Sequence, residues 1–177
     1  MQDFKADDIN QKWCTDFTYL ALVNGDKRYN CSIIDLYDRS IVASITGKHI
    51  TAALAGETLQ KAIDSQPGIN TRRLMLHSDQ GSQYTSKEFT EYCTKLGITQ
   101  SMSKAGYPYD NAPMERYFNT LKNELINLHN YHTEKELYTA IEEFAYTQYN
   151  HVRPHLTIII ERPLRHAMGL NCPIAAN

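Results

Sequence analysis

Three strand-like segments follow one another near the start of this chain, and few folds accommodate that beginning. Residues 12–24 are largely apolar and rich in β-prone types, and Asn24-Gly25-Asp26-Lys27 separates them from a second such segment, 28–37. An Asn-Gly pair between apolar runs is a strong hairpin signal. A third segment at 40–46 follows after the short link Asp38-Arg39. Three successive strands with tight connections predict an antiparallel meander.

Helices and strands alternate after this meander. The expected elements are a helix at 51–65 with Thr51 as a possible N-cap, a strand at 72–77, a helix between Ser86 and Gly97, and a strand at 98–102. A meander followed by strand–helix–strand crossovers predicts an α/β fold. The sheet should be mixed and five-stranded, with three antiparallel strands, two parallel strands and flanking helices.

Two further helices are expected beyond a loop rich in Gly, Pro and Tyr at 103–110. The first carries Glu115, with Asp110 or Asn111 as a candidate cap. Its apolar residues keep helical spacing and should face the core: Met114, Phe118, Leu121, Leu125 and Leu128. The second helix begins at a capping box, Thr133-Glu134-Lys135-Glu136.

The composition is that of one globular domain. The chain has 177 residues, of which 42% are hydrophobic and 21% charged. No apolar run is long enough to span a bilayer, and the polar, acidic N-terminus argues against a secretory signal. The four cysteines are scattered, which predicts reduced thiols in a cytoplasmic protein. A net charge of −2 neither indicates nor excludes nucleic-acid binding.

Three carboxylates stand in distinctive positions. Asp16 interrupts the first strand, Asp79 ends the apolar run that contains the fourth strand, and Glu115 opens a helix. A carboxylate within an apolar strand is costly unless something neutralises it. Three that converge would suit a hard divalent cation such as Mg²⁺ or Mn²⁺. Each also has a purely structural alternative: an edge-strand polar residue, a turn former, and a helix N-terminal carboxylate stabilised by the dipole.

Candidate DNA contacts lie on the same helix as Glu115 and in the loop before it. Glu115, Asn119 and Lys122 share one helical face, and Lys122 lies roughly 10 Å along the axis from Glu115. Lys122 could therefore reach a phosphate or base near the carboxylates, although most helical lysines are merely solvated. Lys104 and Tyr107 of the loop are further candidates. The scattered histidines lack a companion cysteine pair that would indicate zinc.

Several ordered motifs resemble one family. They are Trp13-x-x-Asp16-x-Thr18-Tyr19, the run His77 to Ser86, the run Gly106 to Glu115, Phe118-x-x-Leu121-Lys122-x-Glu124, Tyr149-Asn150, and Arg153-Pro154-His155. Together they resemble the catalytic core of bacterial transposases of the insertion-sequence-three group, relatives of retroviral integrases. The similarity extends from about Phe4 to His155.

This resemblance implies a ribonuclease H-like fold with Asp16, Asp79 and Glu115 as the catalytic, metal-binding residues. It implies two Mg²⁺ ions, for which Mn²⁺ can substitute, with Asp16 as the bridging ligand. The implied activity is DNA strand cleavage and strand transfer by a freed 3′-hydroxyl. DNA at the element ends and at the target, a homo-oligomer, and a helix-turn-helix region elsewhere would be the partners.

The resemblance ends before the C-terminus. After Arg153-Pro154-His155 the chain continues through an unexpected Ile158-Ile159-Ile160 triplet. We therefore expect a catalytic core at 1–155 and an extension of uncertain structure at 156–177. Two alternatives remain open: a structure-specific nuclease of the same fold, and a truncated, non-catalytic remnant that binds DNA or regulates a transposase.

Overall fold

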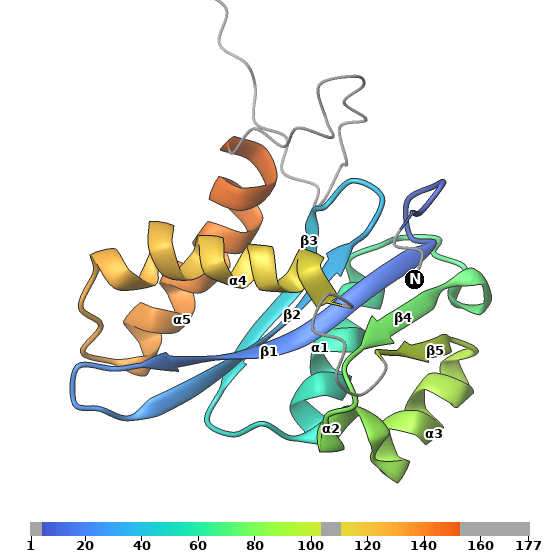
Figure 1. Cartoon of the computed structure of the whole chain (residues 1–177), viewed down its shortest axis with the longest axis horizontal. Helices are drawn as coiled ribbons and strands as arrows, with labels where there is room; N and C mark the ends of the chain where they lie inside the picture. Colours follow the sequence, from blue (N-terminus) through green and yellow to red (C-terminus); the bar gives the residue numbers. More distant parts are fainter. Residues whose placement is uncertain (1–4, 104–110, 153–177) are drawn as a thin grey trace, which may run out of the picture.

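A five-stranded mixed sheet forms the centre of the molecule (Figure 1). The computed structural model describes residues 5–103 and 111–152. The strands are β1 Lys12–Ala21, β2 Lys27–Asp35, β3 Ile41–Gly47, β4 Met75–Ser78 and β5 Thr99–Met102. Their order is β3-β2-β1-β4-β5. The pairs β1–β2 and β2–β3 are antiparallel, whereas β1–β4 and β4–β5 are parallel. The predicted meander with two added parallel strands is confirmed.

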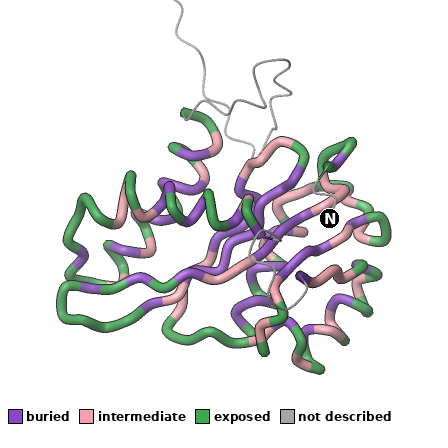
Figure 2. The backbone as a smooth tube through the Cα atoms, viewed as in Figure 1, coloured by how far each residue is buried: buried purple, intermediate pink, exposed green. Residues whose placement is uncertain are grey.

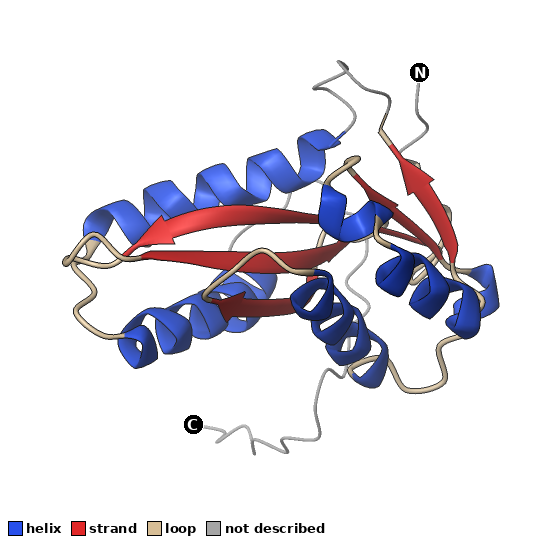
Figure 3. Ribbon diagram, turned by 90° about the horizontal axis from the view of Figure 1, so that it is seen from below, coloured by secondary structure: helices blue, strands red, loops and turns tan. Residues whose placement is uncertain are grey.

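Helices lie on both sides of this sheet (Figure 3). The α-helices are α1 Ala52–Asp64, α2 Ser82–Thr85, α3 Lys87–Leu96, α4 Ala112–Glu124 and α5 Glu134–Glu143. Two 3₁₀ turns, η1 Thr71–Arg73 and η3 Ile126–Leu128, and a π-helix, η4 Phe144–Val152, complete the described elements. Within the described residues, no helix is both long and apolar enough to cross a membrane.

The sheet separates two apolar cores, and the buried backbone follows its strands (Figure 2). Neighbouring residues of a strand point to opposite faces. Trp13 accordingly joins a cluster that includes residues of α1 and α3, whereas Cys14 joins one that includes residues of α4 and α5. Residue Asp16 has the parity of Cys14 and belongs to the α4 side of β1.

The predicted helix ends are largely confirmed. The side chains of Thr51 and Ser86 accept hydrogen bonds from the backbone N–H groups of Leu54 and Phe89. Gly97 ends α3 in the left-handed conformation, at φ 74°. Both halves of the capping box between Thr133 and Glu136 are present.

Three expectations were wrong in detail. The fourth strand begins at Met75, because Asn70 caps a 3₁₀ turn over residues that were expected to be extended. Leu128 is 66% exposed rather than buried, because α4 ends at Glu124 and the chain turns into η3. Asn111 occupies the N-cap position of α4 without making a side-chain cap. The short helix α2 and the π-helix η4 were not predicted.

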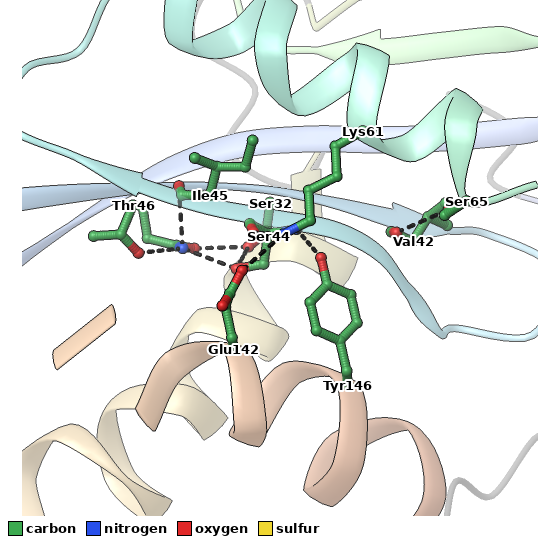
Figure 4. Close-up of polar contacts among 10 residues, drawn as sticks. Ser32, Val42, Ser44, Ile45, Thr46, Lys61, Ser65, Glu142 and Tyr146 are labelled. Atoms are coloured by element: carbon green, nitrogen blue, oxygen red, sulfur yellow. Dashed lines mark hydrogen bonds and ion pairs between the residues drawn. The ribbon is translucent and has the colours of Figure 1, made fainter. Parts of the chain in front are cut away.

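Side chains from both layers close the free edge of β3 (Figure 4). Lys61 of α1 donates to Ser44 O at 3.3 Å and to Glu142 Oε1 at 2.7 Å. The hydroxyl of Tyr146 in η4 accepts the N–H of Ser44 at 2.9 Å. An edge strand presents unpaired backbone groups that invite strand addition. These contacts occupy some of those groups.

Asn150 in η4 extends this closure of the edge and yields a stability prediction. Its Oδ1 accepts the N–H of Ile41 at 2.7 Å and its Nδ2 donates to Ile41 O at 2.9 Å. We expect Asn150→Ala to lower the free energy of unfolding by about 1–3 kcal/mol, because both backbone groups of Ile41 lose a partner. Urea denaturation measures this. The exposed Asn127→Ala should change it by less than about 0.5 kcal/mol, and equal effects of the two variants would refute the edge-pairing role.

Candidate active site

The three predicted carboxylates come from three separate elements that meet on one side of β1. Strand β4 pairs with β1 only from Lys12 to Cys14, so Asp16 lies just beyond the paired stretch. Asp79 directly follows Ser78, the last residue of β4. Because β1 and β4 are parallel and Cys14 pairs with His77, the same register continued by two residues brings Asp16, in the middle of β1, opposite Asp79. Glu115 lies in the first turn of α4, which packs against β1.

The pKa of Asp16 reflects both its burial and the charges of the other two carboxylates. Burial raises the pKa of Asp16 from 3.8 to about 7, and the charges of Asp79 and Glu115 act in the same direction. Hydrogen bonds from the Phe17 N–H and from the Asn111 amide favour the ionised form and oppose this rise. The fold therefore holds a half-buried carboxylate beside two others of the same charge. Such an arrangement is costly without a neutralising cation.

Asn111 contacts Asp16 directly, and this contact was not predicted. The Nδ2 group of Asn111 donates to Asp16 Oδ2 at 3.0 Å. The residue is only 7% exposed. An Asn before a helix normally caps it, and no local pattern indicates a partner 95 positions away in the sequence.

Asp79 is held by a compact loop. Its Oδ1 accepts the N–H of Gly81 at 2.9 Å. Gln80 Nε2 donates to Ser103 O at 2.9 Å, and the His77 ring contacts the hydroxyls of Ser101 and Ser103, each at 3.1 Å. These contacts fasten the Asp79 loop to the end of β5. They also hold the His77 ring between two serine hydroxyls, which is a structural environment.

The carboxylate oxygens of these three residues are the type of ligand that a hard divalent cation prefers. Their side chains are not already arranged around a metal position. Among the described residues, no three His, Cys, Asp or Glu side chains are arranged closely enough to hold a metal ion. The three carboxylates nevertheless supply oxygen ligands, which Mg²⁺ and Mn²⁺ prefer. A cation among them would favour the ionised form of Asp16, and so oppose the burial and the neighbouring charges that raise its pKa. The chemistry of these residues therefore fits the ion that the sequence predicts.

Of the four residues predicted to contact DNA, the structure describes two, Lys122 and Asn119, both on α4. Lys122 Nζ lies 4.5 Å from the ring centroid of Tyr19, a residue of β1 that is 63% exposed. Asn119 is exposed on the same helix. Lys104 and Tyr107 lie outside the described residues. Tyr19 belongs to the first motif of the sequence, but its pairing with Lys122 had no sequence signal.

The cysteines among the described residues are poorly suited to act as nucleophiles. Cys14, Cys31 and Cys93 are free and buried. Burial raises the pKa of all three thiols, to about 11 for Cys31 and about 12 for Cys93. A thiol must ionise to act as a nucleophile. These side chains are therefore core residues.

Comparison with known protein families identifies the class to which this fold belongs. The integrase core domain family matches residues 6–108, and a second integrase core domain family matches residues 96–158. The first match alone covers more than half of the chain. The protein belongs to the integrase core domain family.

Several of its curated relatives are named as transposases. The chain is 36% identical to the transposase for insertion sequence element IS904 of Lactococcus lactis, over 92% of this chain and 63% of the relative. It is 32% identical to transposase InsF for insertion sequence IS3A of Escherichia coli, over 87% of this chain and 52% of the relative. The predicted resemblance to the insertion-sequence-three group is confirmed. The chain spans roughly half to two thirds of the lengths of these relatives.

Solved structures agree on the fold. The catalytic core domain of BIV integrase superposes with a TM-score of 0.62 at 19% identity, covering 83% of this chain and 88% of that one. The HTLV-2 integrase catalytic core in complex with magnesium, in a dimeric form, gives a TM-score of 0.58 at 18% identity, covering 80% and 95%. The fold is that of integrase catalytic cores, and the predicted ribonuclease H-like class is confirmed.

Proposed function

We propose that this chain is the catalytic core of an insertion-sequence transposase that cleaves DNA strands and joins a 3′-hydroxyl end to target DNA. The observation that carries the proposal is that Asp16, Asp79 and Glu115 lie on or directly after neighbouring elements of an integrase core fold, where the charges of Asp79 and Glu115 act on Asp16. The names of the curated relatives support the same reaction.

Each carboxylate has a distinct role in this proposal. Asp16 would be the ligand shared by the divalent ions, and Asp79 and Glu115 would supply the remaining carboxylate ligands. When bound, the ions would supply Lewis-acid stabilisation of charge on the attacking and leaving oxygens. A magnesium-bound integrase core of the same fold supports this choice of ion. Strand β1 carries Asp16, the loop after β4 carries Asp79, and α4 carries Glu115.

The partners follow from the reaction. DNA at the element ends and at the target is the substrate, and a homo-oligomer would hold two ends together. The dimeric form of the HTLV-2 integrase core supports an oligomer in this fold. An end-recognition region with a helix-turn-helix would lie in another part of the protein. The reaction would take place on chromosomal or plasmid DNA in the bacterial cytoplasm.

A joining assay distinguishes this function from its alternatives. The chain is incubated with Mn²⁺, a labelled duplex that carries a free 3′-hydroxyl, and a supercoiled plasmid. A transposase core converts label into plasmid-linked product, whereas a nuclease nicks the plasmid without joining. A non-catalytic remnant retains the duplex in a gel shift and does neither. Nicking without any joined product would overturn the proposal in favour of the nuclease.

Tyr19 and Lys122 provide a prediction for DNA binding. Aromatic faces stack on unpaired bases, and a lysine neutralises a phosphate. We expect Tyr19→Ala to weaken binding of a duplex with a single-stranded end by about 1–3 kcal/mol. Lys122→Ala should reduce the slope of log affinity against log salt by about one. Fluorescence anisotropy across a salt series measures both.

The matched control is Lys87→Ala. Lys87 begins α3, a helix of the other layer, and its amine lies near Glu91 at 3.7 Å. Its removal should leave both the affinity and the salt slope unchanged. If Lys87→Ala lowers the slope as much as Lys122→Ala does, DNA does not select the α4 side of the molecule.

A further inference from the structure

The side chain of Asn111 links the start of α4 to two residues of β1. Its Nδ2 donates to Asp16 Oδ2 at 3.0 Å, and its Oδ1 accepts from Cys14 Sγ at 2.7 Å. Cys14 and Asp16 are two positions apart and therefore share one face of the strand. A single amide thus contacts both side chains at once.

The two partners fix which way this amide points. An ionised carboxylate can only accept hydrogen bonds, whereas a protonated thiol can donate one. The buried Cys14 thiol is the donor to Asn111 Oδ1. The amide presents its NH₂ group to Asp16 and its oxygen to Cys14.

Asn111 makes these contacts in place of its usual local role. It occupies the N-cap position of α4, but its side chain makes no capping hydrogen bond. A side-chain cap of this type stabilises a helix. The residue thus forgoes a common stabilising contact while engaging a carboxylate of the candidate site.

The consequence for Asp16 is a fixed orientation. Asp16 Oδ1 accepts the N–H of Phe17 at 2.7 Å, and Oδ2 accepts the Asn111 amide. Each carboxylate oxygen has two lone pairs, so one on each oxygen stays available for a further ligand. Glu115 lies four residues after Asn111, about one turn along α4. The hydrogen bond between Asn111 and Asp16 therefore also positions the first turn of α4, which carries Glu115, relative to Asp16.

We propose that Asn111 is a positioning residue, which orients Asp16 and docks the Glu115-bearing turn of α4 on β1, with the Cys14 thiol fixing the amide. This inference rests on the proposed function. It assigns to Asn111 and Cys14 a part in assembling the site without direct contact with the reacting atoms.

Mn²⁺ binding to the whole chain tests the inference, followed by electron paramagnetic resonance. Residues that orient a metal ligand typically cost 10–100-fold in affinity when removed. We expect Asn111→Ala and Asn111→Ser each to weaken Mn²⁺ binding by about tenfold or more. Serine is a good N-cap, so Asn111→Ser should retain the wild-type melting temperature. If Asn111→Ser binds Mn²⁺ as tightly as the wild type, the amide has no positioning role.

Cys14 offers a matched pair of variants. Cys14→Ser keeps a donor for Asn111 Oδ1 and should bind Mn²⁺ nearly as the wild type does. Cys14→Ala removes the donor, frees the amide to rotate, and should weaken binding. Equal affinities for the two variants would remove Cys14 from the account.

Two controls separate this inference from the proposed function. If the wild type and Asp16→Asn bind Mn²⁺ alike, the proposed metal site fails, and the positioning role falls with it. If the wild type binds Mn²⁺ more tightly than Asp16→Asn does, and the Asn111 variants bind Mn²⁺ as tightly as the wild type, only the positioning role fails. The contact itself is tested by ¹⁵N NMR without metal. The Asn111 side-chain amide signals should move on Asp16→Ala but not on Asp64→Ala, and insensitivity to Asp16→Ala would overturn the inference.

Discussion

Replacement of any one of the three carboxylates by its amide is expected to abolish strand joining while the fold persists. Asp16→Asn, Asp79→Asn and Glu115→Gln keep the shape of each side chain but remove the charge that a divalent ion requires. We expect the joining rate to fall at least about a thousandfold, or ~4 kcal/mol of transition-state stabilisation. Quantification of plasmid-linked label over time measures the rate.

A remote aspartate is the control for this series. Asp64, the last residue of α1, is exposed and accepts a hydrogen bond from Gln60 at 2.7 Å. Asp64→Asn should join DNA at the wild-type rate. Circular dichroism should show the same helix content for every variant. Near-normal joining by one of the three carboxylate variants would exclude that residue from the site.

Stability of the metal-free protein should fall as pH rises from about 4 to about 7. The pKa of Asp16 moves from 3.8 to about 7 on folding. Below pH 4 the group is protonated in both states, so it costs nothing. Between these values the unfolded chain loses the proton that the folded chain keeps, so the free energy of unfolding decreases with pH. The decrease attributable to Asp16 is about 4 kcal/mol at most.

Comparison with Asp16→Asn isolates this contribution from other titrating groups. In EDTA, the variant should exceed the wild type in unfolding free energy, by a margin that grows with pH and levels off above about pH 7. Added Mn²⁺ should reduce the margin, because a cation favours the ionised carboxylate. Urea denaturation across this pH range measures the margin. A margin independent of pH would show that Asp16 does not carry a raised pKa.

Periodicity and turn chemistry made most of the fold predictable. The Asn24-Gly25 turn, the Thr51 and Ser86 caps and the Thr133 capping box act within a few residues, so their signals are local. The two parallel strands follow from the right-handed crossover rule. The π-helix was not predictable in the same way, because Tyr146 and Asn150 bond to β3 more than 100 positions earlier.

The candidate site shows the same division. Asp16, Asp79 and Glu115 carry recognisable motifs, and each occupies the element that the sequence predicted for it. Their supporting contacts carry no such signal. Asn111 reads as a helix cap from its neighbours alone, and only the tertiary fold brings it to Cys14 and Asp16. From the sequence alone, Tyr19 is predicted only to be a strand residue, because its contact with Lys122 forms only when α4 packs beside β1.

Anomalous scattering from Mn²⁺-soaked crystals tests the central claim most directly, with Glu115→Gln crystals measured alongside. The account predicts a Mn²⁺ peak bounded by Asp16 and Asp79 in the wild type, and a weaker or displaced peak in the variant. In crystals that also contain DNA, we expect the same Mn²⁺ peak, with Glu115 as an additional ligand. A map with no peak at these carboxylates in either crystal, while Mn²⁺ binds elsewhere on the chain, would contradict the proposed active site.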